Sequence, residues 1–331
     1  MLNRGETTLI KPLTLGTKTF PNNLIQGPLA GVSSAPFRLL ASQYGKPAFC
    51  CTEMISCKAL LYKNKSSYQR YIVKDKREGP VCFQLFGNNP QELAEATKYI
   101  TQEGADLIDL NCGCPVKKVR RQGAGSSLLS DTTRLYQMII AMKQNTQLPV
   151  SIKVRVEGNG VEKFNNEVIK AIRDGGADFL VVHGRRFTEH YETSCNYEQI
   201  QYFVEELTIP VIGNGDVFCI DSLKKMLATG CAGAMIARAG VGQPWLTQKL
   251  IAEMNGEVFI PPLPPEIGSI FLKHVSLLIN MFGSEKFAIL NARTLAKYYA
   301  RGLAARKEFC VAINSCEKFE VLEKLVADTF R

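Results

Sequence analysis

The sequence predicts an α/β protein, namely a (β/α)8 TIM barrel followed by a small all-helical domain. Eight short apolar runs recur between residues 24 and 236, and segments with helical periodicity lie between them. Strands that alternate with helices indicate βαβ units and a parallel sheet, and eight units in about 235 residues are typical of a closed barrel. Beyond residue 256 only the helical periodicity continues.

The expected elements of the barrel follow one another in chain order. A hairpin over residues 8–20 comes first. Gly104, Gly176 and Gly230 stand where a helix ends and the next strand begins, as expected of helix C-caps. The expected strands cover residues 24–29, 48–52, 81–86, 107–110, 150–154, 179–182, 211–212 and 233–236. The expected helices cover residues 36–44, 91–102, 133–143, 161–174, 197–206, 220–228 and 244–254.

A proline-rich segment divides the chain into two domains. Residues 259–265 hold four prolines, which makes the segment stiff and unable to pair inside a sheet. We therefore expect a barrel domain over residues 1–258 and a helical domain over residues 259–331. The expected helices of the second domain cover residues 267–281, 288–306 and 319–330.

Composition excludes several classes of protein. No apolar run approaches the roughly 20 residues of a membrane helix, and residues 1–6 lack the apolar core of a secretory signal. Eleven cysteines without regular spacing predict free thiols and a cytoplasmic location. With three histidines and no Cys-x-x-Cys pair, no metal site is expected. Nothing in the sequence requires a protein partner, so we expect a monomer.

Part of the positive charge of the chain is concentrated in one segment, residues 58–77. The formal net charge is +9, and residues 58–77 hold seven basic residues, one acidic residue and three tyrosines. Basic residues interleaved with aromatic ones suit phosphate contact and base stacking. The alternative is a solvated helix face.

The stretch Asn111-Cys112-Gly113-Cys114-Pro115 carries the candidate reactive thiol. It ends the fourth expected strand, at the edge where barrels of this kind place their chemistry, and a basic segment follows it. Most free cysteines are small core residues, and this interpretation is an equal alternative for Cys112. Cys114 lies between a glycine and a proline on a loop, which favours a functional role. The basic residues after it are Lys117, Lys118, Arg120 and Arg121.

Other strand ends add a possible anion site. Residues 213–216 and 237–240 follow the seventh and eighth strands with glycines and Arg238, and these two loops often bind phosphate in this fold. Lys153 interrupts an apolar strand, so it points into the barrel mouth or reaches outward to solvent. A cation in the mouth would stabilise the anionic edge of a reduced flavin, and Gln84 could bond the same edge. His183 is an even choice between a structural and a ligand-binding residue, and the adjacent Arg185 favours contact with an anion.

Together these motifs resemble the signature of the tRNA-dihydrouridine synthases, and the stretch Gly-Gln-Pro-Trp at 242–245 is most similar to the bacterial B-type subgroup. The likeness extends over nearly all of the barrel. Besides the Asn-Cys-Gly-Cys-Pro stretch, it covers residues 27–38, 52–54, 83–87, 123–129, 152–155, 182–185, 213–216 and 234–239. Gly27-Pro28-Leu29 departs from the family's usual Ala-Pro-Met, and residues 186–191 and the helical tail match only loosely.

The resemblance implies an enzyme that reduces uridines of tRNA to dihydrouridine. NADPH would reduce FMN, hydride would pass from flavin N5 to uracil C6, and Cys114 would protonate C5. The helical domain would bind tRNA, with no role for a membrane. The implied FMN-binding residues are Pro28, Leu29, Ala30, Gln84, Lys153, His183, Asn214, Gly215, Asp216, Ala237 and Arg238. The expected substrate contacts are Asn111, Arg185, Lys117, Lys118, Arg120 and Arg121.

Two other functions remain open at this stage. One is an FMN-dependent barrel oxidoreductase that acts on a small molecule, of the dihydroorotate dehydrogenase or enoate reductase kind. It would share the flavin site but would not need the basic loops or the helical tail. The other is a tRNA-binding protein with little catalytic function, against which Gln84, Cys114 and Lys153 argue together.

Overall fold

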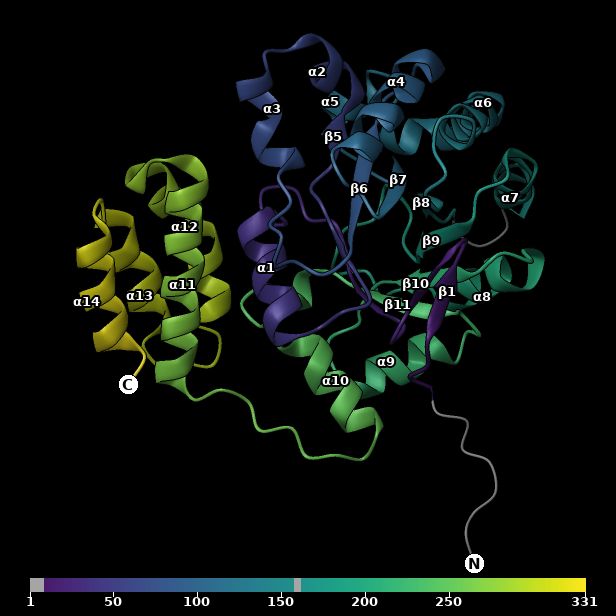
Figure 1. Cartoon of the computed structure of the whole chain (residues 1–331). Coiled ribbons are helices and arrows are strands. Elements are labelled where there is room, and N and C mark those ends of the chain that lie inside the picture. The colour runs from purple at the N-terminus through teal and green to yellow at the C-terminus, as the bar shows by residue number, and fades with distance from the viewer. Residues whose placement is uncertain (1–8, 158–161) are drawn as a thin grey trace, which may run out of the picture.

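The computed structural model describes residues 9–157 and 162–331, and its core is a closed parallel barrel (Figure 1). The strands pair in the order β4-β3-β11-β10-β9-β8-β7-β6, and an additional pairing of β4 with β6 closes the ring. These pairs are all parallel. The barrel strands are β3 (Leu24–Gln26), β4 (Cys50–Cys51), β6 (Val81–Phe86), β7 (Leu107–Cys112), β8 (Val150–Arg155), β9 (Phe179–His183), β10 (Val211–Asn214) and β11 (Gly233–Ile236). The predicted fold class and all eight predicted strands are confirmed.

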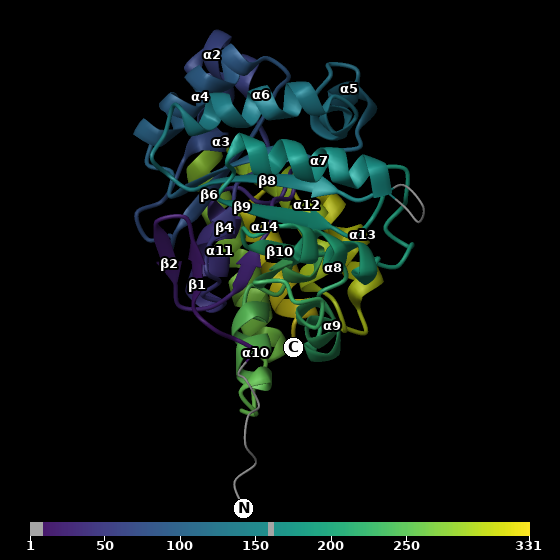
Figure 2. The ribbon, with the colours of Figure 1, turned by 90° about the vertical axis from the view of Figure 1, so that its right-hand side faces the viewer.

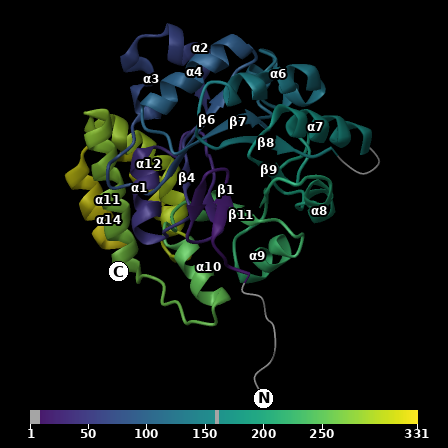
Figure 3. The ribbon, with the colours of Figure 1, turned by 45° about the vertical axis from the view of Figure 1, so that its right-hand side comes forward.

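Helices surround this barrel in chain order, as Figure 3 shows for the side that carries α4, α6, α7, α8 and α9. Their apolar faces pack against the strands in one continuous core. The helices between the strands are α1 (Ala35–Tyr44), α4 (Pro90–Gln102), α6 (Thr132–Lys143), α7 (Glu162–Gly175), α8 (Tyr197–Glu206), α9 (Ile220–Leu227) and α10 (Leu246–Met254). The predicted start of α7 at residue 161 lies outside the described residues.

Each barrel strand sends alternate side chains to opposite sides, as a pleated strand must. In β7, Leu107 joins the cluster inside the barrel, whereas Ile108 and Leu110 join the core between strands and helices. Asp109 pairs in register with Gln84 of β6 and Ser151 of β8. The polar side chains of these three strands therefore share one layer inside the barrel.

A hairpin covers the amino-terminal end of the barrel. β1 (Leu13–Leu15) and β2 (Lys18–Phe20) pair antiparallel, and Leu13, Leu15 and Phe20 join the core inside the barrel. This confirms the hairpin expected before the first barrel strand, although its expected first residue, 8, lies outside the described residues. The closed lower end leaves the carboxyl ends of the strands as the open mouth.

Some elements were not expected from the sequence. A short strand, β5 (Ile55–Ser56), pairs with β6 and leads into α2 (Cys57–Tyr62) and α3 (Lys65–Ile72). The basic, tyrosine-containing segment is therefore largely helical, and Tyr68 is buried against the barrel core. A four-residue helix, α5 (Lys117–Arg120), and a 3-10 turn, η1 (Gly125–Ser130), follow β7, and a second 3-10 turn, η2 (Arg238–Gly240), follows β11.

The helical domain lies against one side of the barrel, next to α1 (Figure 1), and stands behind the barrel after a 90° turn (Figure 2). Phe37 and Leu40 of α1, with Val241 and Trp245, share one apolar core with the helices of the tail. None of the described helices is long and apolar enough to cross a membrane. The helices are α11 (Pro264–Phe282), α12 (Glu285–Tyr299), α13 (Arg306–Ala312) and α14 (Phe319–Thr329), with a 3-10 turn, η3 (Ile313–Ser315), after α13.

The expected helix over residues 288–306 is confirmed as far as Tyr299 and is wrong over residues 300–305. α12 ends at Tyr299, and α13 begins only at Arg306. Gly302 adopts a left-handed φ of 86° between them, a conformation that helices cannot contain.

Candidate active site

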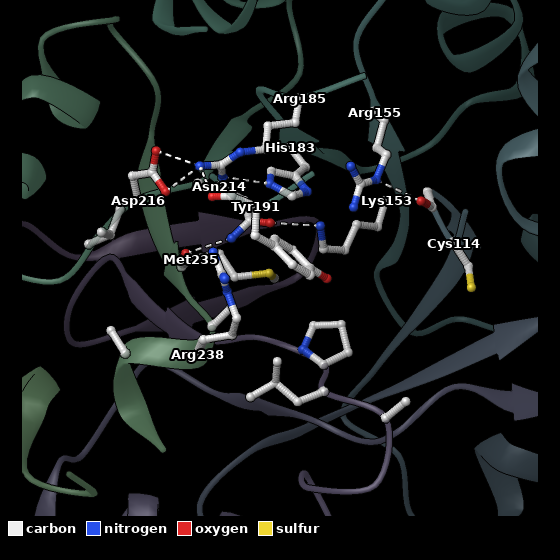
Figure 4. A pocket seen from close by; sticks show the side chains of 18 of the residues that line it. Cys114, Lys153, Arg155, His183, Arg185, Tyr191, Asn214, Asp216, Met235 and Arg238 are labelled. Carbon is white, nitrogen blue, oxygen red and sulfur yellow. Dashed lines mark hydrogen bonds and ion pairs between the residues drawn. The ribbon is translucent and has the colours of Figure 1, made fainter. Parts of the chain in front are cut away.

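A cavity of about 660 Å³ opens at the carboxyl ends of the barrel strands, and each of the eight strands or its following loop contributes to the wall. This size suits a small-molecule ligand. Figure 4 shows the side chains that converge on it. The predicted residues that line it are Pro28, Leu29, Ala30, Gln84, Asn111, Cys114, Lys153, His183, Arg185, Asn214, Gly215, Asp216, Ala237 and Arg238.

Lys153 points into the barrel mouth. Its ammonium donates to Oδ1 of Asn214 at 2.9 Å, and the amide of Asn214 donates to the carbonyl of Met235 at 2.9 Å (Figure 4). Burial lowers the pKa of Lys153 to about 8, with a further lowering by Arg155, whereas Asp109 opposes the shift. The site therefore holds a cation whose charge an anionic ligand would stabilise.

Gln84 and Asn111 form a hydrogen-bonded pair on neighbouring strands. Nδ2 of Asn111 donates to Oε1 of Gln84 at 2.9 Å, and Nε2 of Gln84 donates to the buried carboxylate of Asp109 at 2.7 Å. Both amides are buried in the structure, although both touch the cavity. Their orientation is thus set by the protein before any ligand binds.

The two neighbouring thiols lie in different environments. Cys112 is fully buried in the core between strands and helices, where burial raises the pKa of its thiol. Cys114 is half-buried, lies on the loop beyond β7 and lines the cavity (Figure 4). Nε of Arg155 donates to the carbonyl of Gly113 at 2.8 Å and holds this loop against β8. Of the two cysteines, only Cys114 can meet a molecule in the cavity.

Arg185 is held inside the protein. Its side chain is only 1% exposed, and Nη2 donates to both carboxylate oxygens of Asp216, at 2.6 and 2.7 Å. Nε and Nη2 also donate to the carbonyls of Thr193 and Tyr191. The predicted contact of Arg185 with substrate stays a prediction. In the structure its donors instead fix the loop after β9.

His183 lies beside Arg185 and is also buried. Burial first, then the nearby charges of Lys153 and Arg155, lower the pKa of His183 far below its usual range. The ring is therefore neutral at physiological pH. A neutral imidazole can accept or donate one hydrogen bond to a ligand, but it contributes no charge of its own.

Arg238 faces Tyr191 across the mouth of the cavity. The guanidinium carbon lies 3.8 Å from the centroid of the Tyr191 ring, which is a cation–π contact (Figure 4). Arg238 begins η2, and the loop after β10 turns at Gly215 and Asp216, both with positive φ. A side chain at Gly215 would meet Sγ of Cys195 at 2.6 Å, so this turn requires glycine.

The basic residues after Cys114 do not line the cavity but flank it, on α5 and at the residue after its end. Lys117, Lys118 and Arg121 are exposed. Arg120 is half-buried and lies 4.1 Å from the ring centroid of Phe187, on the loop after β9. Its role in the structure is to connect two loops of the mouth.

Sequence reasoning missed several residues of the wall, among them Tyr298 and Arg301. Both come from the helical domain, at the end of α12 and the turn beyond it, yet they line the same cavity. Tyr191, on a loop that strays from the family pattern, is a third. Gly242, with its positive φ, lies against the backbone of Tyr298 and was the one local signal for this approach.

The cavity fits the flavin mononucleotide that the resemblance implies. A buried ammonium and an oriented amide, those of Lys153 and Gln84, suit the polar edge of a flavin ring, and Pro28, Leu29 and Met235 supply apolar wall. Arg238 and the loops after β10 and β11 suit a phosphate, because helix and turn N–H groups and a guanidinium bind such anions.

The fold and this site define a barrel enzyme with its ligand site at the carboxyl ends of the strands. A family model described as "Dihydrouridine synthase (Dus)" matches residues 25–330, so the chain belongs to the dihydrouridine synthase family. The resemblance drawn from the motifs is confirmed.

Two bacterial relatives support the subgroup. A protein of Pseudomonas aeruginosa named tRNA-dihydrouridine synthase B is 32% identical over 91% of this chain and 90% of its own length. The protein of that name from Vibrio cholerae is 33% identical over 94% of this chain and 98% of its own. Among solved structures, a variant of NCR from Zymomonas mobilis shares the fold with a TM-score of 0.53 at 13% identity, covering 75% of this chain and 92% of that one.

Proposed function

We propose that this protein reduces specific uridines of tRNA to 5,6-dihydrouridine, with FMN as its cofactor and NADPH as the reductant. The observation that carries the proposal is the position of Cys114, half-buried on the wall of a cavity that also holds Lys153 and Gln84. Membership of the dihydrouridine synthase family supports the reaction class. The name shared by the relatives supports tRNA as the substrate.

Each residue of the cavity has a distinct part in this reaction. When bound, FMN would supply the hydride that reaches C6 of the uracil ring. Cys114 donates the proton to C5, so the C5=C6 double bond becomes a single bond and the thiolate later regains a proton from solvent. Lys153 and Gln84 would hold the polar edge of the bound cofactor, and Asn111 would contact the uracil. Arg238 and the loops after β10 and β11 would hold its phosphate.

A uridine inside folded RNA can reach Cys114 only if it leaves its stack. Extruding a base costs a few kcal/mol, which contacts between the protein and the RNA backbone must offset. Lys117, Lys118 and Arg121 are exposed beside the mouth and can neutralise phosphates there. The helical domain, residues 259–331, would extend this surface and also close the cavity through Tyr298 and Arg301.

A flavin oxidoreductase for a small molecule would use the same Lys153 and Gln84, but it would gain nothing from the exposed lysines of α5. We also propose a cytoplasmic monomer. All eleven cysteines are free thiols in the structure, which suits a reducing compartment.

The two thiols offer a matched test. The FMN-loaded protein is reduced with NADPH and then mixed with unmodified tRNA, and its reoxidation is followed in a single turnover. Loss of a positioned general acid costs about 10²–10⁴-fold in rate. Cys114→Ala should therefore be reduced normally and then reoxidise that much more slowly, whereas Cys112→Ala should keep most of the rate. A wild-type protein that binds no FMN, or whose reduced form is not reoxidised by tRNA, would refute the proposal.

A further inference from the structure

Asp109 is a buried carboxylate inside the barrel and is not one of the residues that line the cavity. Its side chain is 3% exposed and lies one layer below Asn111, which is two residues further along β7. Oδ1 accepts from the hydroxyl of Ser151 at 2.6 Å, and Oδ2 accepts from Nε2 of Gln84 at 2.7 Å. A buried carboxylate is costly unless it is well hydrogen-bonded, so Asp109 depends on the donors of Ser151 and Gln84.

A continuous series of hydrogen bonds leads from this carboxylate to the loop of Cys114. Gln84 donates to Asp109 and accepts from Nδ2 of Asn111 at 2.9 Å. Oδ1 of Asn111 then accepts from the backbone N–H of Cys114 at 3.0 Å and of Gly113 at 3.3 Å. We call this series, Asp109 through Gln84 and Asn111 to the Cys114 backbone, the Asp109 relay.

The two ends of the Asp109 relay determine the direction of both amides between them. An ionised carboxylate can only accept, and a backbone N–H can only donate. The amides of Gln84 and Asn111 must therefore align head to tail, because reversing either one would place donor against donor or acceptor against acceptor. Burial raises the pKa of Asp109 to about 7, opposed by its bonds to Ser151 and Gln84 and by Lys153. The carboxylate is therefore mainly ionised above neutral pH.

We propose that Asp109 is a positioning residue, which fixes the loop of Cys114 through the side chains of Gln84 and Asn111. It touches neither the thiol nor the space that a substrate would fill, and it acts only through its partners. Gln84 also lines the cavity. The same residues therefore fix the position of the Cys114 loop relative to the part of the cavity where a flavin ring would bind. Its importance for the reaction rests on the proposed function, whereas the positioning itself does not.

Two measurements on the whole chain report how often the loop of Cys114 opens. One is the rate at which iodoacetamide alkylates Cys114 at about pH 8.5, where thiols react as thiolates, followed by mass spectrometry of its peptide. Cys219, another partly exposed thiol on a different loop, serves as the internal reference. The second is hydrogen exchange of the peptide that carries the amides of Gly113 and Cys114. Neither depends on catalysis.

Four variants separate positioning from general destabilisation. Asp109→Ala removes the acceptor at the start of the Asp109 relay. Gln84→Met removes the next side chain that forms these hydrogen bonds, and it serves as the test if Asp109→Ala does not fold. Asp109→Asn keeps an acceptor for Gln84 and can donate to Ser151, so the loop of Cys114 should keep its wild-type position. Ile108→Ala is the matched control, because the neighbouring buried side chain faces the helices instead.

Loss of one hydrogen bond of this kind should speed local opening about two- to tenfold. We expect that increase in both Cys114 alkylation and exchange for Asp109→Ala and Gln84→Met, and near wild-type values for Asp109→Asn and Ile108→Ala. Unchanged rates in both relay variants, or an equal increase in Ile108→Ala, would overturn the proposal. If the loop responds as expected but tRNA does not reoxidise the enzyme, positioning stands and the proposed function fails.

Discussion

Gly242 of the barrel lies directly against the backbone of Tyr298 in the helical domain. A Cβ atom on Gly242 would lie 2.4 Å from the carbonyl carbon of Tyr298 and 2.6 Å from its oxygen. Backbone atoms cannot yield as the end of a flexible side chain can. The absence of a side chain at Gly242 therefore allows α12 to approach the barrel closely enough for Tyr298 and Arg301 to enter the cavity wall.

Replacing Gly242 by alanine should loosen this junction. Gly242 also has a left-handed φ of 74°, so alanine adds backbone strain to the clash. Gly256 has φ 76° with open space around it, and Gly256→Ala therefore carries the strain alone. Overpacking typically costs about 1–3 kcal/mol, and Gly242→Ala should be less stable than Gly256→Ala by that amount in denaturant unfolding. Equal stabilities would show that the junction can open without cost.

His274 should make the protein sensitive to acid. It lies on α11 and is fully buried, Nδ1 lies 3.0 Å from the hydroxyl of Tyr299 at the end of α12, and burial lowers the pKa of the ring to about 3. The unfolded chain binds a proton below about pH 6.5. The folded protein does not, so stability falls as the pH decreases from there towards 3. The contribution of His274 to the slope approaches 1.4 kcal/mol per pH unit.

The measurement is the free energy of unfolding by denaturant between about pH 4 and pH 7.5. His274→Gln should show a shallower decline than wild type, because glutamine cannot take up the proton. Leu278→Ala, on the same helix, should be less stable at every pH with the wild-type slope. Parallel curves for wild type and His274→Gln would contradict the buried neutral ring.

Much of the fold was predictable because, in the barrel, the hydrophobic pattern of each segment agrees with its position in the tertiary structure. The apolar runs that became β6, β7 and β8 are buried on both faces, so their hydrophobicity reports their position directly. Lys153 and Gln84 were predicted for the same reason, since a polar side chain within such a run must have a partner or a ligand.

What could not be predicted depends on contacts distant in sequence. Asp109 looks like an ordinary strand residue until the register places it between Gln84 and Ser151. Tyr298 and Arg301 reach the cavity only because the helical domain docks on α1 and the segment after β11. For the same reason, a chain cut near residue 258 would expose a shared apolar core and lose part of the cavity wall.

Arg238 provides a test of the phosphate end of the cavity. If it binds the phosphate of FMN, Arg238→Met should weaken FMN binding by about 10- to 100-fold, the value of one charge-assisted hydrogen bond. Riboflavin, which has the same ring without the phosphate, is the control ligand, and its affinity should change little. The measurement is the quenching of flavin fluorescence during titration. An equal loss for both flavins would place Arg238 at the ring instead.

The exposed lysines of α5 provide the sharpest test of the RNA surface. Lys117 and Lys118 are adjacent, exposed and next to the mouth. Each phosphate contact that is lost should reduce the salt dependence of binding by about 0.7 to 0.9 in log–log slope. The double variant Lys117→Glu, Lys118→Glu should therefore bind tRNA more weakly at low salt, with a slope smaller by up to about two units. Reduction by NADPH should be unchanged, since neither residue lines the cavity.

Lys224 and Lys225 supply the matched control for this reversal. They are also adjacent and exposed, but they lie on α9, in the outer layer of the barrel. Lys224→Glu, Lys225→Glu makes the same change in net charge, so any effect of overall charge appears in both double variants. Filter binding across a range of salt concentrations compares the two. A weakening confined to the α5 variant supports phosphate contacts at the mouth, whereas an equal weakening shows that only the total charge matters.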